Sequence, residues 1–387
     1  LEAQGQLLPL YGVPFAAKDN IDVEGFVTTA ACPDFAYSAV EDAGVIAELR
    51  KAGAIVIGKT NLDQFATGLV GTRSPYGIVP NTFDTSYISG GSSSGSASVV
   101  ARGLVPFALG TDTAGSGRVP AGLNNIVGLK PTRGLLSARG VVPACRSLDC
   151  VSILALTTED AQLVLQIASV YDEKDAFSRP VPAIHPAYTI IDKPRMAICD
   201  SPPWFGKTEQ QVAYDMALKK CSALGWELIS IDFASLFKLA SLLYEGPWVA
   251  ERFAAIKDFI KKPNIQMDPV VRGIIQKAEG FSSVDVFEAE YLRRDLSREI
   301  ETAFKGFDAI LVPTTPTFPT IQDLANEPVV ENSRLGTYTN FVNFMDWSAL
   351  SFPAGFRSDG LPFGLTLIST QWEEGKLLDL SRSFLSG

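Results

Sequence analysis

The sequence has 387 residues, of which 46% are hydrophobic, and a formal net charge of −10 at pH 7. These values are typical of a globular protein with a sizeable core. The acidic balance argues against a nucleic-acid partner, and the absence of a long apolar run argues against a membrane span. Five scattered cysteines without a CxxC pair indicate free thiols in a reducing compartment, so we expect a cytoplasmic protein.

The first predicted element is a short buried strand within residues 10–20, in LYGVPFAAKDN. Lys18 follows a run of apolar and small residues there. Most lysines at strand ends reach solvent, but this setting makes a buried amine a serious alternative. Burial disfavours the charged form of a lysine and lowers its pKa, which allows the neutral amine to act as a base.

The next elements alternate between helix and strand. Apolar residues at helical spacing predict a helix over 42–52, and a β-branched run predicts a buried strand over 54–58. A further helix is predicted to begin within 60–65, and 71–88 is predicted to be a loop. This alternation is typical of an α/β layer architecture.

Two turns rich in glycine and serine, GGSSSGS and GTDTAGSGR, flank a helix predicted over 94–102 and a strand predicted over 105–109. Glycine lets backbone amides approach a bound group closely, and each turn presents a serine. We interpret Ser116 as a nucleophile and Ser92 as its proton relay. A phosphate-binding loop is an alternative, but the GxxxxGK[ST] pattern is absent. A purely structural turn is the other alternative.

The second half of the chain continues the alternation. The remaining helices are predicted over 158–171, 209–224, 241–259 (interrupted at Gly246 and Pro247) and 284–304, and the strands over 196–200, 226–231, 309–313 and 364–368. The helix over 284–304 is highly charged and predicted to face solvent, and a turn is predicted at the PAG sequence of 353–355. The one histidine, His185, lies in a proline-rich link over 178–194, where we expect a surface loop. A Ser-His-Asp triad and a histidine-rich zinc site are therefore both disfavoured.

Four motifs give the chain its resemblance to the amidase signature family: GVPFAAKDN, GGSSSGSA, GTDTAGSGRVP and VGLKPTRG. The resemblance covers nearly the whole chain. It implies an α/β fold in which a central, mixed, twisted β-sheet is covered by helices on both faces. It also implies that residues 1–387 form a single domain.

The family uses a Ser–cis-Ser–Lys triad, which the motifs assign to particular residues of this chain. The nucleophile falls on Ser116, the relay on Ser92 and the base on Lys18, while Ser93 and Ser94 are rivals for the relay. The resemblance implies that no metal or organic cofactor is required. It implies an oxyanion hole formed by the backbone amides of Thr113, Ala114, Gly115 and Ser116.

Longer segments, among them LYEGPWVAERF and NSRLGTYTNFVN, resemble the members of the family that hydrolyse allophanate, a urea that carries a carboxylate on one nitrogen. Such a small anion requires a cation, and the resemblance implies that Tyr244 and Arg252 bind it. The planar guanidinium is suited to a carboxylate, although a surface salt bridge with Glu251 is the alternative for Arg252. We expect the helical region 205–305 to line the substrate site.

The resemblance also implies a homodimer and a urea carboxylase as partner or fused neighbour. Because the chain begins at Leu1 without methionine and ends at Gly387, we expect the amidase portion of a longer protein, without the C-terminal domain of such enzymes. Two alternatives remain open. One is a broader amidase or the glutaminase subunit of a tRNA amidotransferase, and the other is a scaffold that lost the chemistry.

Overall fold

A twisted mixed sheet forms the centre of the computed structural model, which describes residues 8–182 and 191–387. Its strands are β1 Pro14–Lys18, β4 Ile55–Thr60, β5 Phe107–Asp112, β6 Val127–Lys130, β7 Cys150–Ala155, β8 Arg195–Cys199, β9 Glu227–Ile231, β10 Ala309–Pro313, β11 Ser348–Phe356 and β12 Pro362–Ser369. In the described residues they are joined in the order β4-β1-β5-β7-β6-β11-β12-β10-β8-β9. The strands at the two ends are parallel and the pairs between them are antiparallel. A separate small sheet pairs β2 Val27–Thr28 with β3 Tyr37–Ser38.

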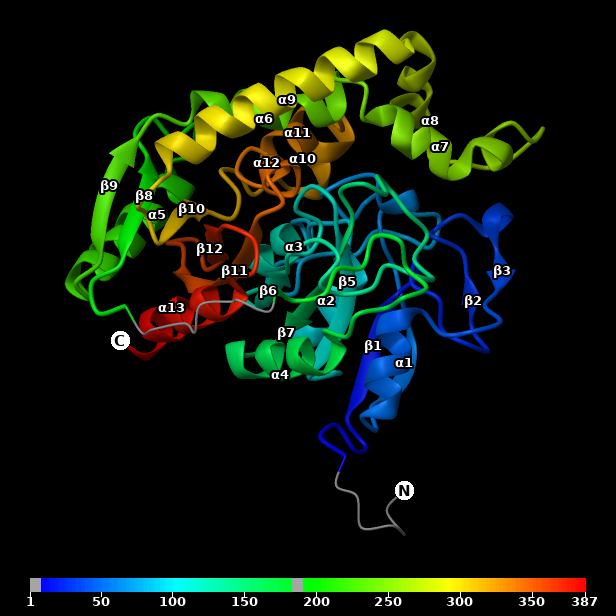
Figure 1. Ribbon diagram of the computed structural model, residues 1–387, viewed down its shortest axis with the longest axis horizontal. Helices are drawn as coiled ribbons and strands as arrows, with labels where there is room; N and C mark the ends of the chain where they lie inside the picture. The colour runs from blue at the N-terminus through cyan, green and yellow to red at the C-terminus, as the bar shows by residue number, and fades with distance from the viewer. Residues whose placement is uncertain (1–7, 183–190) are drawn as a thin grey trace.

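Helices cover both faces of this sheet, as predicted (Figure 1). The helices of the described residues, not all of which contact the sheet, are α1 Gly44–Lys51, α2 Ser94–Ala101, α3 Arg118–Leu123, α4 Thr158–Ala168, α5 Thr208–Ala223, α6 Ala234–Glu245, α7 Val249–Ile260, α8 Pro269–Gln276, α9 Ser283–Ala303, α10 Ile321–Asn326, α11 Val330–Leu335, α12 Asn340–Phe344 and α13 Glu374–Ser386. The helices α1, α4, α5 and α13 pack on one face. The helices α2, α3, α6 and α12 pack on the other.

The side chains of neighbouring strands decide how closely each helix approaches the sheet. Successive strand residues face opposite sides, so Phe15 and Phe107 stack at 5.1 Å in the core beneath α1 and α4. Ala16 and Ala108 face α2 on the other side. Because these alanines are small, α2 lies close to the sheet, and so does the turn that precedes it.

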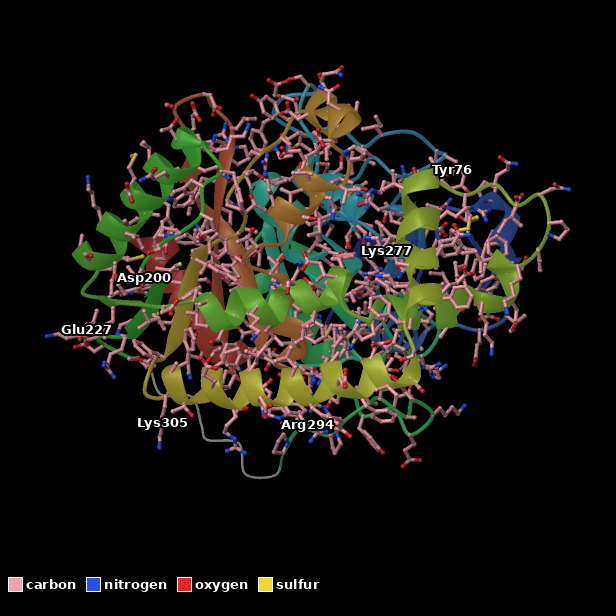
Figure 2. All side chains as sticks on the ribbon, turned by 90° about the horizontal axis from the view of Figure 1, so that it is seen from above. Tyr76, Asp200, Glu227, Lys277, Arg294 and Lys305 are labelled. Atoms are coloured by element: carbon pink, nitrogen blue, oxygen red, sulfur yellow. The ribbon has the colours of Figure 1, made fainter. Side chains whose placement is uncertain are left out.

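Most predicted helices are confirmed, including the break at Gly246 and Pro247 that separates α6 from α7. The long helix α9 buries only Ala289, Leu296 and Ile300. Figure 2 shows α9 along one side of the molecule, with Arg294 on its outer surface. The predicted solvent-facing helix is therefore confirmed. No helix in the described part of the chain is long and apolar enough to cross a membrane.

Two predictions before the first serine turn are wrong. The strand predicted as buried over 54–58 is the sheet edge, where Ile55 is 53% and Ile57 is 55% exposed. The helix predicted to begin within 60–65 is replaced by a single 3-10 turn, Gln64–Ala66. Phe65 and Ala66 have φ near +50°, a left-handed conformation that ends helical geometry.

Two further predictions differ from the structure. The PAG sequence of 353–355 is not a turn but part of β11, where the register with β12 shifts. The second serine turn continues into α3, in which Pro120 lies in the first turn, where no backbone donor is needed. His185 lies outside the described residues.

Candidate active site

The predicted triad residues lie at the carboxyl ends of the neighbouring strands β1 and β5. Parallel strands present their carboxyl ends at the same edge, and β1 and β5 are parallel neighbours. Lys18 is the last residue of β1, Asp112 is the last of β5, and Ser92 lies two positions before α2. The close packing of α2 on the alanines of both strands therefore brings Ser92 to Lys18.

The lysine is fully buried and contacts three hydroxyl groups. Its Nζ lies 2.7 Å from Ser92 Oγ, 3.0 Å from Ser93 Oγ and 2.7 Å from Thr111 Oγ1. The Ser93 hydroxyl donates its own proton to the carbonyl of Thr111 at 3.1 Å. In the described part of the chain, Ser92 Oγ has no partner besides Lys18. This favours Ser92 over Ser93 as the serine that exchanges a proton with the amine.

Burial is the main reason that Lys18 has an unusual pKa. It lowers the pKa from 10.5 to about 7, against the opposing charges of Asp63, Asp112 and Asp149. In a large fraction of the molecules the Lys18 amine is therefore neutral at physiological pH. The expected buried amine is confirmed.

A buried ion pair shapes the loop that carries Ser116. Asp112 Oδ1 accepts from Arg118 Nη2 at 2.9 Å and from the Gly115 amide at 2.8 Å. Asp112 Oδ2 accepts from Arg118 Nε at 2.9 Å and from the Gly117 amide at 3.1 Å. Both charged side chains are completely buried. Arg118 Nη2 also donates to the Thr339 carbonyl at 3.1 Å and to Asn343 Oδ1 at 3.2 Å, whereas Nη1 has no partner in the described residues.

The second support of this loop is Thr339, whose hydroxyl donates to the Ala114 carbonyl at 2.6 Å. Gly115 has φ +123°, and a side chain there would collide with Thr339, so glycine is required. Of the four amides expected in the oxyanion hole, that of Gly115 is already bonded to Asp112. The amides of Thr113, Ala114 and Ser116 donate no hydrogen bond within the described residues.

Ser116 and Ser92 lie on adjacent backbones, but their hydroxyls are not hydrogen-bonded to each other in the described structure. The Ser93 amide donates to the Ser116 carbonyl at 3.2 Å. The Ser116 hydroxyl instead donates to the Gly68 carbonyl at 3.5 Å. The peptide bond between Gly91 and Ser92 is cis, as the resemblance implies.

The surface salt bridge considered for Arg252 is wrong, because this arginine is 2% exposed. Its Nη1 donates to Thr67 Oγ1 at 3.0 Å and to the Ala66 carbonyl at 3.4 Å, and its Nη2 donates to the Tyr244 hydroxyl at 3.3 Å. Within the described residues, no carboxylate pairs with it and its Nε has no partner. The neighbouring Glu251 instead accepts from Ser147 Oγ at 2.8 Å. Arg252 is therefore a buried cation that forms no ion pair with a carboxylate in residues 8–182 and 191–387, although the charges of Asp149 and Glu251 act on it from further away.

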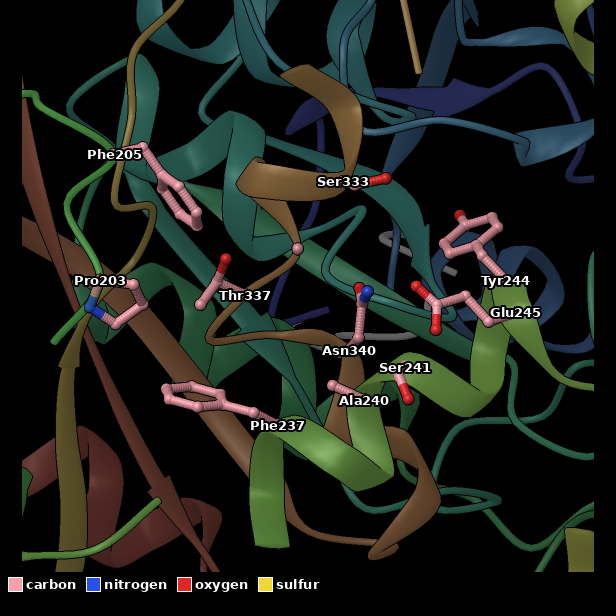
Figure 3. A pocket seen from close by; sticks show the side chains of 11 residues that line it. Pro203, Phe205, Phe237, Ala240, Ser241, Tyr244, Glu245, Ser333, Thr337 and Asn340 are labelled. Atoms are coloured by element: carbon pink, nitrogen blue, oxygen red, sulfur yellow. The ribbon is translucent and has the colours of Figure 1, made fainter. Parts of the chain in front are cut away.

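A cavity of ≈ 310 Å³ is lined by Tyr244, the hydrogen-bond partner of Arg252. Figure 3 shows Tyr244 at one end of it and Pro203 and Phe205 at the other. Asn340 also lines the cavity, and the preceding Thr339 holds the loop of Ser116. Arg252, Lys18, Ser92 and Ser116 are not among the residues that line this cavity in the described structure, so it meets the site only through Tyr244 and Asn340.

Sequence reasoning missed Thr67, Thr111 and Asp149. Burial raises the pKa of the Asp149 carboxyl to about 6, although it accepts from the Thr113 hydroxyl at 2.5 Å and the Ala144 amide at 2.8 Å. A lone acid ahead of an apolar strand was the only available signal for Asp149. No cluster of histidine, cysteine and acidic side chains suited to a metal ion occurs within residues 8–182 and 191–387.

The chain is similar to known proteins over nearly its whole length. A family model described as Amidase matches residues 1–378. A urea amidolyase of Saccharomyces cerevisiae is 53% identical over 98% of this chain, which spans 21% of that protein. A solved Kluyveromyces lactis allophanate hydrolase is 52% identical with a TM-score of 0.96, over 98% of this chain and 62% of that one. A glutamyl-tRNA(Gln) amidotransferase subunit from Chlorobium luteolum is 34% identical over 96% of this chain and 83% of its own length.

Proposed function

The chain belongs to the amidase family, and on that premise we propose that it hydrolyses allophanate at the terminal carboxamide and releases ammonia. One observation carries the proposal. Within the described residues Arg252 is buried without a carboxylate partner, it bonds to Tyr244, and it contacts Thr67, whose neighbour Gly68 contacts Ser116. A neutral amide has no charge that could pair with such a cation, whereas the carboxylate of allophanate can form an ion pair with it.

The proposed reaction begins with neutral Lys18, which accepts the proton of Ser116 through Ser92. The Ser116 hydroxyl turns from the Gly68 carbonyl toward Ser92 as its oxygen attacks the carboxamide carbon. The developing oxyanion lies against the free backbone amides of the loop, and one such donor typically contributes about 3 kcal/mol.

The same relay returns the proton to the leaving nitrogen, so that ammonia departs and an ester to Ser116 remains. Water then attacks the ester carbon and gives its proton to Lys18 through Ser92. The C–O bond breaks, Ser116 regains its proton, and N-carboxycarbamate is released. The chain, the substrate and water supply every group that these steps require.

Substrate binding falls to α6 and α7, which lie within the helical region expected over 205–305. Tyr244 lies near the C-terminal end of α6, and Arg252 lies in the first half of α7. The ring of Tyr244 lies 5.3 Å from the guanidinium carbon, so both contribute to one carboxylate site. Their hydrogen bond fixes the guanidinium plane before the substrate arrives.

The test is ammonia release by the purified chain, given allophanate and, separately, propionamide. We expect a strong preference for allophanate, and we expect Arg252→Ala to abolish that preference. Comparable turnover of both amides by the unaltered chain would identify a general amidase, as the similarity to an amidotransferase allows. A failure to turn over either amide, together with no fluorophosphonate labelling of Ser116, would identify a scaffold without chemistry.

The wider setting of the reaction is also a proposal. The chain spans about a fifth of the matched urea amidolyase, which supports a urea-carboxylating unit fused to it or acting beside it. The five cysteines are buried and unpaired, which supports a reducing, cytoplasmic location. Light scattering of the purified chain tests the expected homodimer.

A further inference from the structure

Two consecutive residues, Thr67 and Gly68, contact the two groups that the proposed function uses. Arg252 Nη1 donates to Thr67 Oγ1 at 3.0 Å. Ser116 Oγ donates to the carbonyl of Gly68 at 3.5 Å. The cation and the nucleophile therefore touch neighbouring residues, whose Cα atoms are about 3.8 Å apart.

The backbone around Thr67 is held firmly from several sides. The Thr67 amide donates to the Gln64 carbonyl at 3.0 Å, and its carbonyl accepts from Arg73 Nη1 at 3.0 Å. The buried carboxylate of Asp63 accepts from the amides that follow, those of Val70, Gly71 and Arg73, each at 3.0 Å. A segment fixed in this way keeps the spacing between its contacts constant.

The Thr67 hydroxyl orients Arg252 without neutralising it. Its single proton goes to the Phe65 carbonyl at 3.2 Å, so its oxygen is available to accept from the guanidinium. A carboxylate in this position would pair with the cation and compete with a substrate anion. The Arg252 Nε, buried without a partner in the described part of the chain, shows that the cation still has bonding capacity.

We propose that Thr67 is a positioning residue that aims Arg252 toward Ser116 and thereby sets the length of the substrate. Because Arg252 and Ser116 contact adjacent residues, the site favours a short anion, and in allophanate the carboxylate carbon is two bonds from the scissile carbonyl carbon. This inference rests on the proposed function, since it assumes that Arg252 binds the anion. It adds that Thr67, an uncharged residue, decides how far apart the carboxylate and the scissile carbonyl of a substrate can be.

The test compares Thr67→Val, which keeps the branched shape but loses the hydroxyl, with Thr67→Ser, which keeps the hydroxyl. Thr72→Val is the matched control, because no hydrogen bond of the Thr72 side chain occurs in the described structure. The first readout is KM and kcat for allophanate. The second is protection of Ser116 from a fluorophosphonate by malonamate, in which CH₂ replaces the bridging NH of allophanate, and this readout needs no turnover.

We expect Thr67→Val to raise KM and to weaken malonamate protection, each about tenfold, as for one lost hydrogen bond to a charged group. Its kcat and its labelling rate without malonamate should change less than about threefold, since the Ser116 contacts remain. Thr67→Ser should have the same KM for allophanate and the same malonamate protection as the unaltered chain.

Several results would overturn the inference. An unchanged KM and unchanged protection in Thr67→Val would refute it while allophanate hydrolysis stands. An equal loss in Thr67→Ser or in Thr72→Val would assign the effect to packing. Absence of malonamate protection in the unaltered chain would refute it as well. Protection that depends on Thr67, in a chain that does not prefer allophanate, would overturn the proposed function alone.

Discussion

Lys18 gives the sharpest prediction, because its role depends on its neutral form. Burial lowers its pKa from 10.5 to about 7. At pH 7 about half of the Lys18 amines are then neutral, against about one in 3,000 for a lysine with the ordinary value. The rate of fluorophosphonate labelling of Ser116 should therefore rise with pH through about 7 and level off above it.

The magnitude follows from the fraction of neutral amine. Labelling at pH 6 should be about tenfold slower than at pH 8. The value of kcat/KM for allophanate should rise over the same pH range, which is the rising limb of both pH profiles. Lys18→Met should be slow at every pH, because no base remains next to Ser92. Equal labelling at pH 6 and pH 8, or a limb that appears only above pH 9, would refute the reasoning.

Asp149 is the rival for this limb, since burial raises the pKa of its carboxyl to about 6. The negative charge of Asp149 raises the pKa of Lys18. Removal of that charge in Asp149→Asn should therefore move the limb to lower pH without abolishing it. A limb that disappears in Asp149→Asn would assign the titration to Asp149.

Three other substitutions test separate parts of the site. Ser116→Ala should abolish ammonia release and fluorophosphonate labelling, and residual labelling at another serine would contradict the assignment of the nucleophile. Arg252→Ala should raise KM for allophanate by roughly 30-fold, which corresponds to about 2 kcal/mol for a lost charged partner, with a smaller effect on kcat; an unchanged KM would remove Arg252 from the substrate site. Asp112→Asn should lower the free energy of unfolding in urea by about 3 kcal/mol or more, because it leaves the buried Arg118 charge uncompensated. Full stability in that variant would mean that water reaches the pair.

The triad stays a prediction, but the contact between Lys18 and Ser92 agrees with it, and each of its residues lies in a continuous segment with its own signature. Lys18 ends GVPFAAK, and Ser92 and Ser116 lie in glycine-rich turns, so the local pattern and the resemblance together pointed to them. The parallel pairing of β1 and β5, which brings the three segments together, could only be expected from the family. Thr111 was missed for this reason, since its contact with Lys18 depends on that pairing.

The errors have equally specific causes. The apolar run at β4 predicted burial, but periodicity cannot tell a central strand from an edge strand, and Ile55 and Ile57 face outward. The helix expected near residues 60–65 fails because Phe65 and Ala66 adopt positive φ, held by bonds to distant parts of the chain. Thr67 contacts Arg252 from 185 positions away, and no local pattern records such a contact.

The electrostatics of the site couple substrate binding to the base. The positive charge of Arg252 lowers the pKa of Lys18, although burial is the larger cause. A substrate carboxylate paired with Arg252 cancels that positive charge, so the pKa of Lys18 should rise when the substrate binds. The limb of kcat, which reports the enzyme–substrate complex, should then lie at higher pH than the limb of kcat/KM, which reports the free enzyme. In Arg252→Ala the limb of fluorophosphonate labelling should also move to higher pH. If both limbs coincide and Arg252→Ala leaves the labelling profile unchanged, the cation acts on the substrate alone and not on the base.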